Sequence, residues 1–282
     1  DTTTNTVTTL TNFFNASRDR YTSQLVGTKI YIPQSYGTAL EIIDTTTDTV
    51  TTLTNFFNAS RSRYTSQLVG TKIYIPQHNG TALEIIDTTT NTVTTLTNFF
   101  SSSRNRNTRQ LVGTKIYIPQ HIGTTLEIID TTNNTVTTID SFFNASRNRY
   151  TSQLVGTKIY IPEYYGTALD IIDTTNNTVT TIDSFFNASR YRRTSQLVGT
   201  KIYIPQHDRR GLDIIDTTTN TVTTIDSFFN ASRYRYTSQL VGTKIYIPEN
   251  IGTALEIIDT TNFTANTLPV RNNTETQRRQ VS

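Results

Sequence analysis

Residues that could carry chemistry are few in this chain. It has three histidines and no cysteine, which excludes disulfide bonds and thiolate metal sites. The single adjacent pair of an imidazole and a carboxylate is His207 and Asp208, and Arg209 and Arg210 follow it. Such a pair is able to transfer protons, although a pair of this kind in a loop is usually a solvated turn. We find no P-loop, nucleophile elbow, dinucleotide fingerprint or metal-ligand spacing.

The remaining charged residues recur with a period, as structural ion pairs do and a single catalytic site does not. We therefore expect no catalytic residue, no metal and no cofactor, and we keep a lyase or hydrolase that uses His207 as the alternative. The six lysines all occur in Gly-Thr-Lys, at Lys29, Lys72, Lys115, Lys158, Lys201 and Lys244. Twelve of the 19 arginines occur in Ser-Arg-x-Arg, and the net charge is only +3. No long basic tract favours nucleic acid as a partner.

The whole chain is organised as an internal repeat. An aspartate opens a segment that begins Asp-Thr-Thr every 43 residues, at Asp1, Asp44, Asp87, Asp130, Asp173, Asp216 and Asp259. Six near-identical units fill residues 1–258, starting at 1, 44, 87, 130, 173 and 216, and a divergent tail fills residues 259–282. We predict that the units form one domain and that the tail holds an extra strand at most.

Each unit predicts four short strands. In the stretch 64–100 these are strand A (64–69), strand B (72–77), strand C (82–87) and strand D (92–100). Gly70-Thr71 suits a two-residue type II′ turn between A and B. β-branched and aromatic residues dominate the apolar set, no segment has a helical period, and no apolar run is long enough to cross a membrane. Four strands in about 43 residues is the size of a β-propeller blade.

The alternation of side chains predicts which residues share a face of the blade. Placing the B–C turn at Asn79 pairs Ile73 with Ile85 and Ile75 with Leu83. That register puts Glu84 on the opposite face, where we expect it to bond Tyr74 or a lysine of a neighbouring blade.

The stretch GTKIYIPQ…GTALEIIDTTTNTVTTL resembles the YVTN-type β-propeller repeat, through the Gly-Thr turn, the tyrosine of strand B, the Ile-Ile-Asp end of strand C and the Thr-Asn-Thr-Val hairpin. The chain departs from that pattern in having Pro-Gln or Pro-Glu where the family has Thr-Asn. The resemblance implies an extracellular or cell-surface propeller, and relatives include surface-layer proteins. WD40 repeats are excluded by the absence of tryptophan. The absence of methionine is typical of a processed product, such as one that has lost a secretory signal, or of a fragment.

Counting strands predicts how the ring closes. Residues 6–14 form a D strand that precedes any A–B–C set, so we expect an all-β, six-bladed propeller closed by this N-terminal strand pairing with the last blade. Residues 259–270 also resemble a D strand, with Pro269 limiting its pairing. If the tail fills its own slot, the N-terminal strand is free to complete a neighbouring molecule by donor-strand exchange. A surface layer or filament subunit that self-associates through its terminal strands is therefore the second function hypothesis.

The units differ mainly in two connections, which a propeller places at the same end. The D–A connection reads RDRY, RSRY, RNRN, RNRY, RYRR and RYRY, and the B–C connection reads SYG, HNG, HIG, YYG, HDRR and NIG. Tolerated drift is the simpler interpretation, because change in loops costs little. Tyr, Arg and His are also enriched in recognition surfaces. The candidate ligand-binding residues are Arg18, Arg20, Tyr21, Tyr36, Arg61, Arg63, Tyr64, His78, Arg104, Arg106, His121, Arg147, Arg149, Tyr150, Tyr164, Tyr165, Arg190, Tyr191, Arg192, His207, Arg209, Arg233, Tyr234 and Arg235.

These observations predict a non-catalytic, secreted or cell-surface module with a structural or adhesive role. Its loop face would bind a partner, with a glycan as the first choice, and a ring of arginines would favour an anionic ligand. Five Asn-Ala-Ser sequons in the D–A connection are candidate glycosylation sites, at Asn15, Asn58, Asn144, Asn187 and Asn230. Sugars on that face would compete with a ligand, so these two hypotheses constrain each other.

Overall fold

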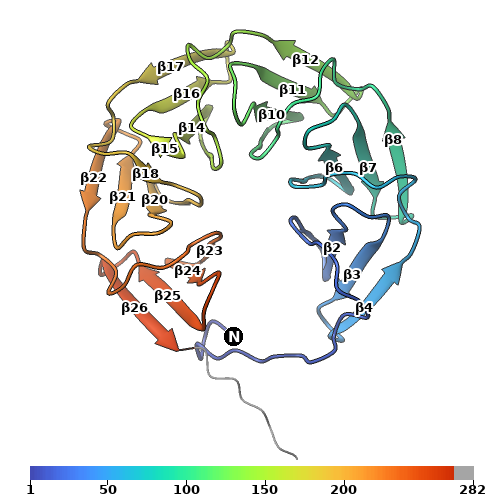
Figure 1. Cartoon of the computed structure of the whole chain (residues 1–282), viewed down its shortest axis with the longest axis horizontal. Coiled ribbons are helices and arrows are strands. Elements are labelled where there is room, and N and C mark those ends of the chain that lie inside the picture. Colours follow the sequence, from blue (N-terminus) through green and yellow to red (C-terminus); the bar gives the residue numbers. More distant parts are fainter. Residues whose placement is uncertain (270–282) are drawn as a thin grey trace, which may run out of the picture.

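The computed structural model describes residues 1–269 and shows an all-β fold. Six four-stranded antiparallel sheets stand like blades around an open centre (Figure 1). Within each sheet the strands follow the chain order from A at the inside to D at the outside. No helix occurs among these residues. The predicted six-bladed propeller with four-stranded blades is confirmed.

The four strand types recur with nearly constant bounds. The inner A strands are β1 (Gln24–Val26), β5 (Gln67–Val69), β9 (Gln110–Val112), β13 (Gln153–Val155), β19 (Gln196–Val198) and β23 (Gln239–Val241). The B strands are β2 (Lys29–Pro33), β6 (Lys72–Pro76), β10 (Lys115–Pro119), β14 (Lys158–Pro162), β20 (Lys201–Pro205) and β24 (Lys244–Pro248). The C strands are β3 (Leu40–Asp44), β7 (Leu83–Asp87), β11 (Leu126–Asp130), β16 (Leu169–Asp173), β21 (Leu212–Asp216) and β25 (Ala254–Asp259). The outer D strands are β4 (Thr49–Leu53), β8 (Thr92–Leu96), β12 (Thr135–Ile139), β17 (Thr178–Ile182), β22 (Thr221–Ile225) and β26 (Thr264–Pro269). A further short pair joins β15 (Tyr165–Gly166) to β18 (Arg190–Tyr191).

The turn between strands A and B has the predicted form. Val69 lies opposite Lys72, which leaves only Gly70 and Thr71 in the turn. Gly70 has φ +58°, whereas Thr71 is not among the residues with positive φ. This is the combination that a type II′ turn requires, and glycine adopts it without a steric penalty.

The predicted register between strands B and C is wrong by one residue. Ile73 lies opposite Ile86 and Ile75 lies opposite Glu84. The B–C turn is closed by a hydrogen bond from Gln77 N to Ala82 O at 2.9 Å, so the turn centres between residues 79 and 80 rather than at 79. A slip of one residue moves every side chain of a strand to the other face. Ile86 therefore joins Ile73 and Ile75, not the opposite face.

Each of the four middle blades buries both faces of its sheet against its neighbours, and the first and last blades bury one face each in this way. In one such interface Tyr74, Leu83 and Ile85 of the second blade pack against Ile116, Ile118 and Ile129 of the third, and Phe100 from the D–A connection completes the cluster. The same set of residue types recurs in five clusters, one between each pair of consecutive blades. This repeated packing explains why the central part of the repeat does not vary.

The expectation that the N-terminal strand closes the ring is wrong. The last blade takes its outer strand from β26, which pairs with β25 from Asp259↔Thr264 to Ala254↔Pro269. Residues 1–14 form no strand, and they lie across the opening between the last and first blades (Figure 1). The tail segment β26 takes this position, and the N-terminal segment does not, because β26 follows β25 directly through a tight turn. The sixth blade therefore continues past residue 258 to Pro269, and the rest of the predicted tail lies outside the described residues.

Candidate ligand-binding face

The two variable connections lie side by side, as the propeller geometry predicts. Three B–C turns form a bridge with the following D–A connection: Gly37 with Arg61, Gly80 with Arg104 and Gly166 with Arg190. The backbone NH of His78 donates to the carbonyl of Ser62 at 2.9 Å. The residue types that vary between units therefore gather at one end of the ring, which we call the loop face.

The second arginine of each Ser-Arg-x-Arg motif has a structural position. The Arg106 guanidinium stacks 3.7 Å from the centre of the Phe100 ring. It donates to both carboxylate oxygens of Glu127, at 2.6 and 2.7 Å, and to the carbonyl of Gly80 at 2.7 Å. The equivalent side chains are 0% exposed at Arg63, Arg106, Arg149, Arg192 and Arg235. These five arginines cannot touch a ligand on this surface, which corrects their assignment as binding residues.

The acidic partner of this arginine lies in strand C of the same blade. Glu84 pairs with Arg63, so its predicted partners, Tyr74 and a neighbouring lysine, are wrong. Tyr74 instead donates its hydroxyl to the carbonyl of Thr131 in the next blade, at 3.2 Å. The register explains both results, because it places Glu84 and Tyr74 on opposite faces.

The first arginine of each motif is half-buried and also paired. Arg104 lies 3.6 Å from Glu127 and 2.9 Å from Asp140. The other members of this ring likewise contact a carboxylate, namely Arg18, Arg61, Arg147, Arg190 and Arg233. Arg20, in the first blade, keeps 21% of its side chain exposed but pairs with Glu41. Every one of the twelve motif arginines thus has a carboxylate partner, which weakens the expectation of an anionic ligand.

Exposed tyrosines, packed against largely buried histidines, form the inner part of the loop face. Tyr21 stacks on Tyr64 at 4.5 Å, and Tyr64 contacts the His78 ring at 4.4 Å. The Tyr36 and Tyr64 hydroxyls share a hydrogen bond of 2.9 Å, which together with burial raises the pKa of Tyr64. Tyr21 and Tyr36 are 55% and 53% exposed. This cluster is held rigidly and yet offers wide aromatic surfaces to solvent.

A second aromatic cluster lies on the fourth and fifth blades. Tyr150 contacts both His121 and Tyr164 at 4.2 Å. Tyr191 lies 5.2 Å from Tyr164 and stacks on Tyr165 at 4.6 Å. The short strands β15 and β18 pair Tyr165 with Tyr191, which fixes these two rings relative to each other.

A third cluster continues this arc onto the last blade. His207 contacts Tyr236 at 4.6 Å and Tyr234 at 5.5 Å. The Arg193 guanidinium lies 3.8 Å from the centre of the Tyr236 ring and 5.2 Å from that of Tyr150. We call the three clusters the aromatic collar, comprising Tyr21, Tyr36, Tyr64, His78, His121, Tyr150, Tyr164, Tyr165, Tyr191, Arg193, His207, Tyr234 and Tyr236. Asn107 interrupts the collar at the position that Tyr64 and Tyr150 hold in their units.

The histidines hold the loop face together through hydrogen bonds to backbone carbonyls. Nδ1 of His207 donates to the carbonyl of Arg235 at 3.1 Å, and His121 makes the same bond to Arg149. Burial is the main cause that lowers the pKa of His78 and of His121, which keeps both rings neutral near pH 7. No hydrogen bond between His207 and Asp208 occurs in the described structure.

Two residues of the collar were missed as members of the site. Arg193 and Tyr236 both hold the collar position three residues before strand A. An alignment of the six units shows both residues, because Tyr, Asn and Arg all occur at this position of the repeat. Arg109 likewise replaces the serine of the other units, and its Nε donates to the carbonyl of Ser66 at 2.7 Å. Burial lowers the pKa of Arg109 to about 10.

The sequon asparagines lie away from the collar. All five are exposed: Asn15, Asn58, Asn144, Asn187 and Asn230. Asn144 accepts a hydrogen bond from Thr181 at 3.3 Å and Asn230 accepts one from Thr267 at 3.2 Å. Those threonines belong to the outer strands β17 and β26, whereas the collar precedes the inner strands. Sugars at these positions would sit on the outer rim, so they need not compete with a ligand at the collar.

Comparisons with known proteins establish the fold class. No family model and no curated protein sequence matches the chain, so the resemblance to the YVTN repeat stays a prediction. Virginiamycin B lyase from Staphylococcus aureus is similar in structure, with TM-score 0.73 and 12% identity over 91% of this chain and 86% of that one. The extracellular domain of a putative one component system, BT4673 from B. thetaiotaomicron, matches with TM-score 0.67 and 14% identity over 91% of this chain and 35% of that one. The Neurospora crassa Pan2 WD40 domain matches with TM-score 0.65 and 8% identity, covering 91% and 80%. The protein is a β-propeller, and identities this low show the fold alone.

Two features are absent from residues 1–269. These residues contain no helix of the length and apolarity that crossing a bilayer demands. They also contain no group of three or more His, Asp or Glu side chains arranged to hold a metal ion.

Proposed function

We propose that this propeller is a non-catalytic binding module whose aromatic collar holds a carbohydrate. The observation that carries the proposal is the set of rigid, exposed tyrosines at the inner part of the loop face. Tyr21, Tyr36, Tyr165 and Tyr234 are each about half exposed, although they pack against other rings. Aromatic side chains held in this way supply contact area at a low entropic cost, and their flat apolar faces match the CH faces of sugar rings.

The charge distribution favours a neutral or weakly acidic sugar over a polyanion. The motif arginines form ion pairs with Glu and Asp side chains, so they add little net charge to the surface. Arg193 has no carboxylate partner in the described structure, and it stacks on Tyr236. It gives the collar one local cation near Tyr150, where a single acidic group of a sugar would be tolerated.

The proposal is tested with cellohexaose, a hyaluronan hexasaccharide and a heparin hexasaccharide as probes, by titration calorimetry. We expect cellohexaose or the hyaluronan fragment to bind, and heparin to show no advantage at physiological salt. Tyr150→Ala together with Tyr165→Ala should weaken binding by tenfold or more, because loss of a central aromatic contact typically costs over 1 kcal/mol.

The chain offers a matched control for this variant. Asn107 holds the same repeat position as Tyr150 but adds no ring, so Asn107→Ala should leave the affinity unchanged. Absence of binding by all three probes, or equal losses in the two variants, would contradict the proposal. Thermal unfolding of each variant separates a lost contact from a lost fold.

The alternative functions have less support in the geometry. Donor-strand exchange needs a C strand without an outer partner, yet each of the six C strands already pairs with its own D strand. A filament built in this way would have to displace β26. The lyase alternative requires His207 to act on a substrate, and a turnover assay of His207→Ala tests it. An extracellular location agrees with the sequons and with the extracellular domain among the similar structures.

A further inference from the structure

Within residues 1–269 the ring has six blades but only five packed interfaces between them. Every interface has two halves. The first half consists of Tyr, Leu and Ile of one blade with the Phe that follows it, and the second half consists of three Ile of the next blade. The last blade presents the first half, with Tyr246 and Leu255, and the first blade presents the second half, with Ile30 and Ile32. None of these four residues belongs to a packed cluster. Figure 1 shows the two blades facing each other across an opening.

Exposure confirms that these two halves lack the cover that the other blades have. Leu255 is partly exposed, whereas the corresponding Leu212 is 0% exposed. Leu25 is 59% exposed, whereas Leu68 at the same repeat position is only partly exposed. Pro248 is exposed, while the equivalent prolines of the other blades are buried.

The N-terminal residues already form the outer part of an additional blade in this opening. Asp1 Oδ1 accepts a hydrogen bond from the NH of Thr3 at 2.8 Å, as Asp44 does from Thr46 at 2.9 Å in an ordinary C–D turn. The hydroxyl of Tyr246 donates to the carbonyl of Thr2 at 3.2 Å. This bond matches the contact of Tyr31 with the C–D turn of the blade that follows it, also 3.2 Å.

Residues 6–10 then follow the course of an outer strand that has no sheet to join. Their sequence, Thr-Val-Thr-Thr-Leu, is identical to that of β4 and β8. They form no strand, and Val7 and Leu10 are 38% and 50% exposed. Further along, Asn15 accepts a hydrogen bond from Thr52 at 3.5 Å, as Asn144 does from Thr181. Residues 1–15 thus span the opening in the position of a C–D turn and D strand.

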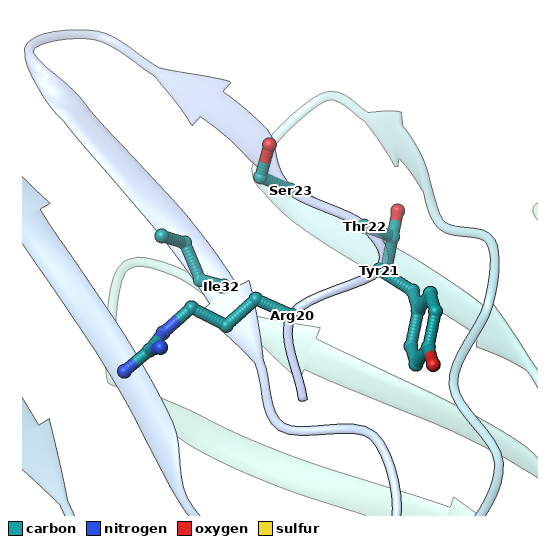
Figure 2. Close-up of a pocket in the computed structure, with 5 residues that line it drawn as sticks. All are labelled: Arg20, Tyr21, Thr22, Ser23 and Ile32. Carbon is teal, nitrogen blue, oxygen red and sulfur yellow. The ribbon is translucent and has the colours of Figure 1, made fainter. Parts of the chain in front are cut away.

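Two cavities flank the space where the inner strands of such a blade would lie. One, of about 290 Å³, is lined by Asp1, Asn5 and Val7 together with Tyr246 and Leu255. The other, of about 230 Å³, lies on the first blade and is lined by Arg20, Tyr21, Thr22, Ser23 and Ile32 (Figure 2). In Figure 2 the side chains of Arg20 and Tyr21 point to opposite sides of the chain. Apolar surface is therefore open on both sides of the gap.

We propose that this opening is a docking slot for one A–B–C unit of the same repeat, with residues 6–10 as its fourth strand. The unit carries both faces that the slot requires, since Ile73, Ile75 and Ile86 fit the last blade as they fit the first in the existing cluster. Its Tyr74 and Leu83 would cover the first blade in the same way. Its strand C would pair with Val7–Leu10 as β7 pairs with β8. The occupant is a three-stranded sheet of this sequence type, rather than a second intact ring.

The slot is tested first by adding a peptide with the sequence of residues 56–86 to the full chain. Hydrogen exchange of the amides of residues 7–10 should slow by at least tenfold, because they gain partners in a sheet. A control peptide carries Ile73→Asn and Ile75→Asn, which remove the apolar face, and it should have no effect. Sugar binding plays no part in this readout, so failure of the slot and failure of the collar are distinguishable.

A second experiment decides the matter if the peptide aggregates. The sequence of residues 56–86 is fused directly before Asp1, which reproduces the junction between Ile86 and Asp87. We expect the fused unit to resist trypsin and the melting temperature to rise by several degrees. Rapid cleavage of the fused unit with unchanged exchange at residues 7–10 would overturn the proposal. Concentration-dependent dimers of the unmodified chain that protect residues 7–10 would overturn it as well, since a second copy would then fill the slot.

Discussion

The buried arginine is expected to contribute far more to stability than its half-buried neighbour in the same motif. Arg104 and Arg106 both contact Glu127, but Arg106 is 0% exposed and Arg104 is 13% exposed. Replacing Arg106 with alanine leaves Glu127, only 2% exposed, without its two close hydrogen bonds. Loss of one partner from a buried pair costs about 3–5 kcal/mol, and the contact with Arg104 at 3.6 Å keeps the loss near the lower end.

The comparison variant is Arg104→Ala, for which we expect a loss below about 1 kcal/mol, the usual range for exposed pairs. Urea denaturation of both variants measures the two free energies of unfolding. The double variant Arg106→Ala with Glu127→Ala should be less destabilised than the sum of its single variants, by about 0.5–3 kcal/mol. Equal losses for Arg104→Ala and Arg106→Ala, or a fully additive double variant, would refute the assignment of Arg106 as a buried structural cation.

Two further predictions concern pH and the A–B turn. The folded-state pKa values of His78 and His121 lie below the ordinary value, so the unfolded chain binds more protons in this range and stability should fall as pH drops below about 6.5. Urea midpoints between pH 7.5 and 5 measure this fall, and His78→Gln with His121→Gln should flatten the curve; an unchanged slope would argue against the two histidines. Gly70→Ala should cost about 1–2 kcal/mol, because φ is +58° and no neighbour lies within 4 Å, so the penalty is conformational alone. Gly70→Asn should cost less in the same denaturation assay, and an equal loss would point to packing instead.

The architecture could be predicted from the sequence because six units carry the same strand and turn signals. The 43-residue period, the positive-φ glycine at the A–B turn and the alternating apolar residues are local signals, and they gave the blade and its strand order. The B–C register was predicted wrongly because the centre of a turn cannot be read from composition. A loop with an even number of residues and a loop with an odd number place Glu84 on opposite faces of the sheet. The closure of the ring was predicted wrongly because the N-terminal segment and the tail carry the same D-strand pattern. Chain connectivity decides which of the two pairs with β25.

The juxtaposition of the two variable connections was predicted correctly, whereas the ligand-binding role of their residues stays a prediction. The variable loops do meet at one end, because the blade topology fixes which turns lie together. The arginines looked like a cationic ring because the sequence does not show that Arg106 turns inward onto Phe100 and Glu127. Arg193 and Tyr236 were missed although Tyr21, Tyr64 and Tyr150, at the same position of the repeat, were included.

The central claim is that a ligand binds the aromatic collar at the loop face. A hydrogen-exchange footprint of the chain, saturated with whichever of the three oligosaccharides binds best, tests it directly. We expect slower exchange around Tyr64, Tyr150 and Tyr191, and no change at the Gly-Thr turns, such as Gly70 and Gly156, at the opposite end. Protection confined to those turns, or no protection at the collar under saturating sugar, would contradict the account.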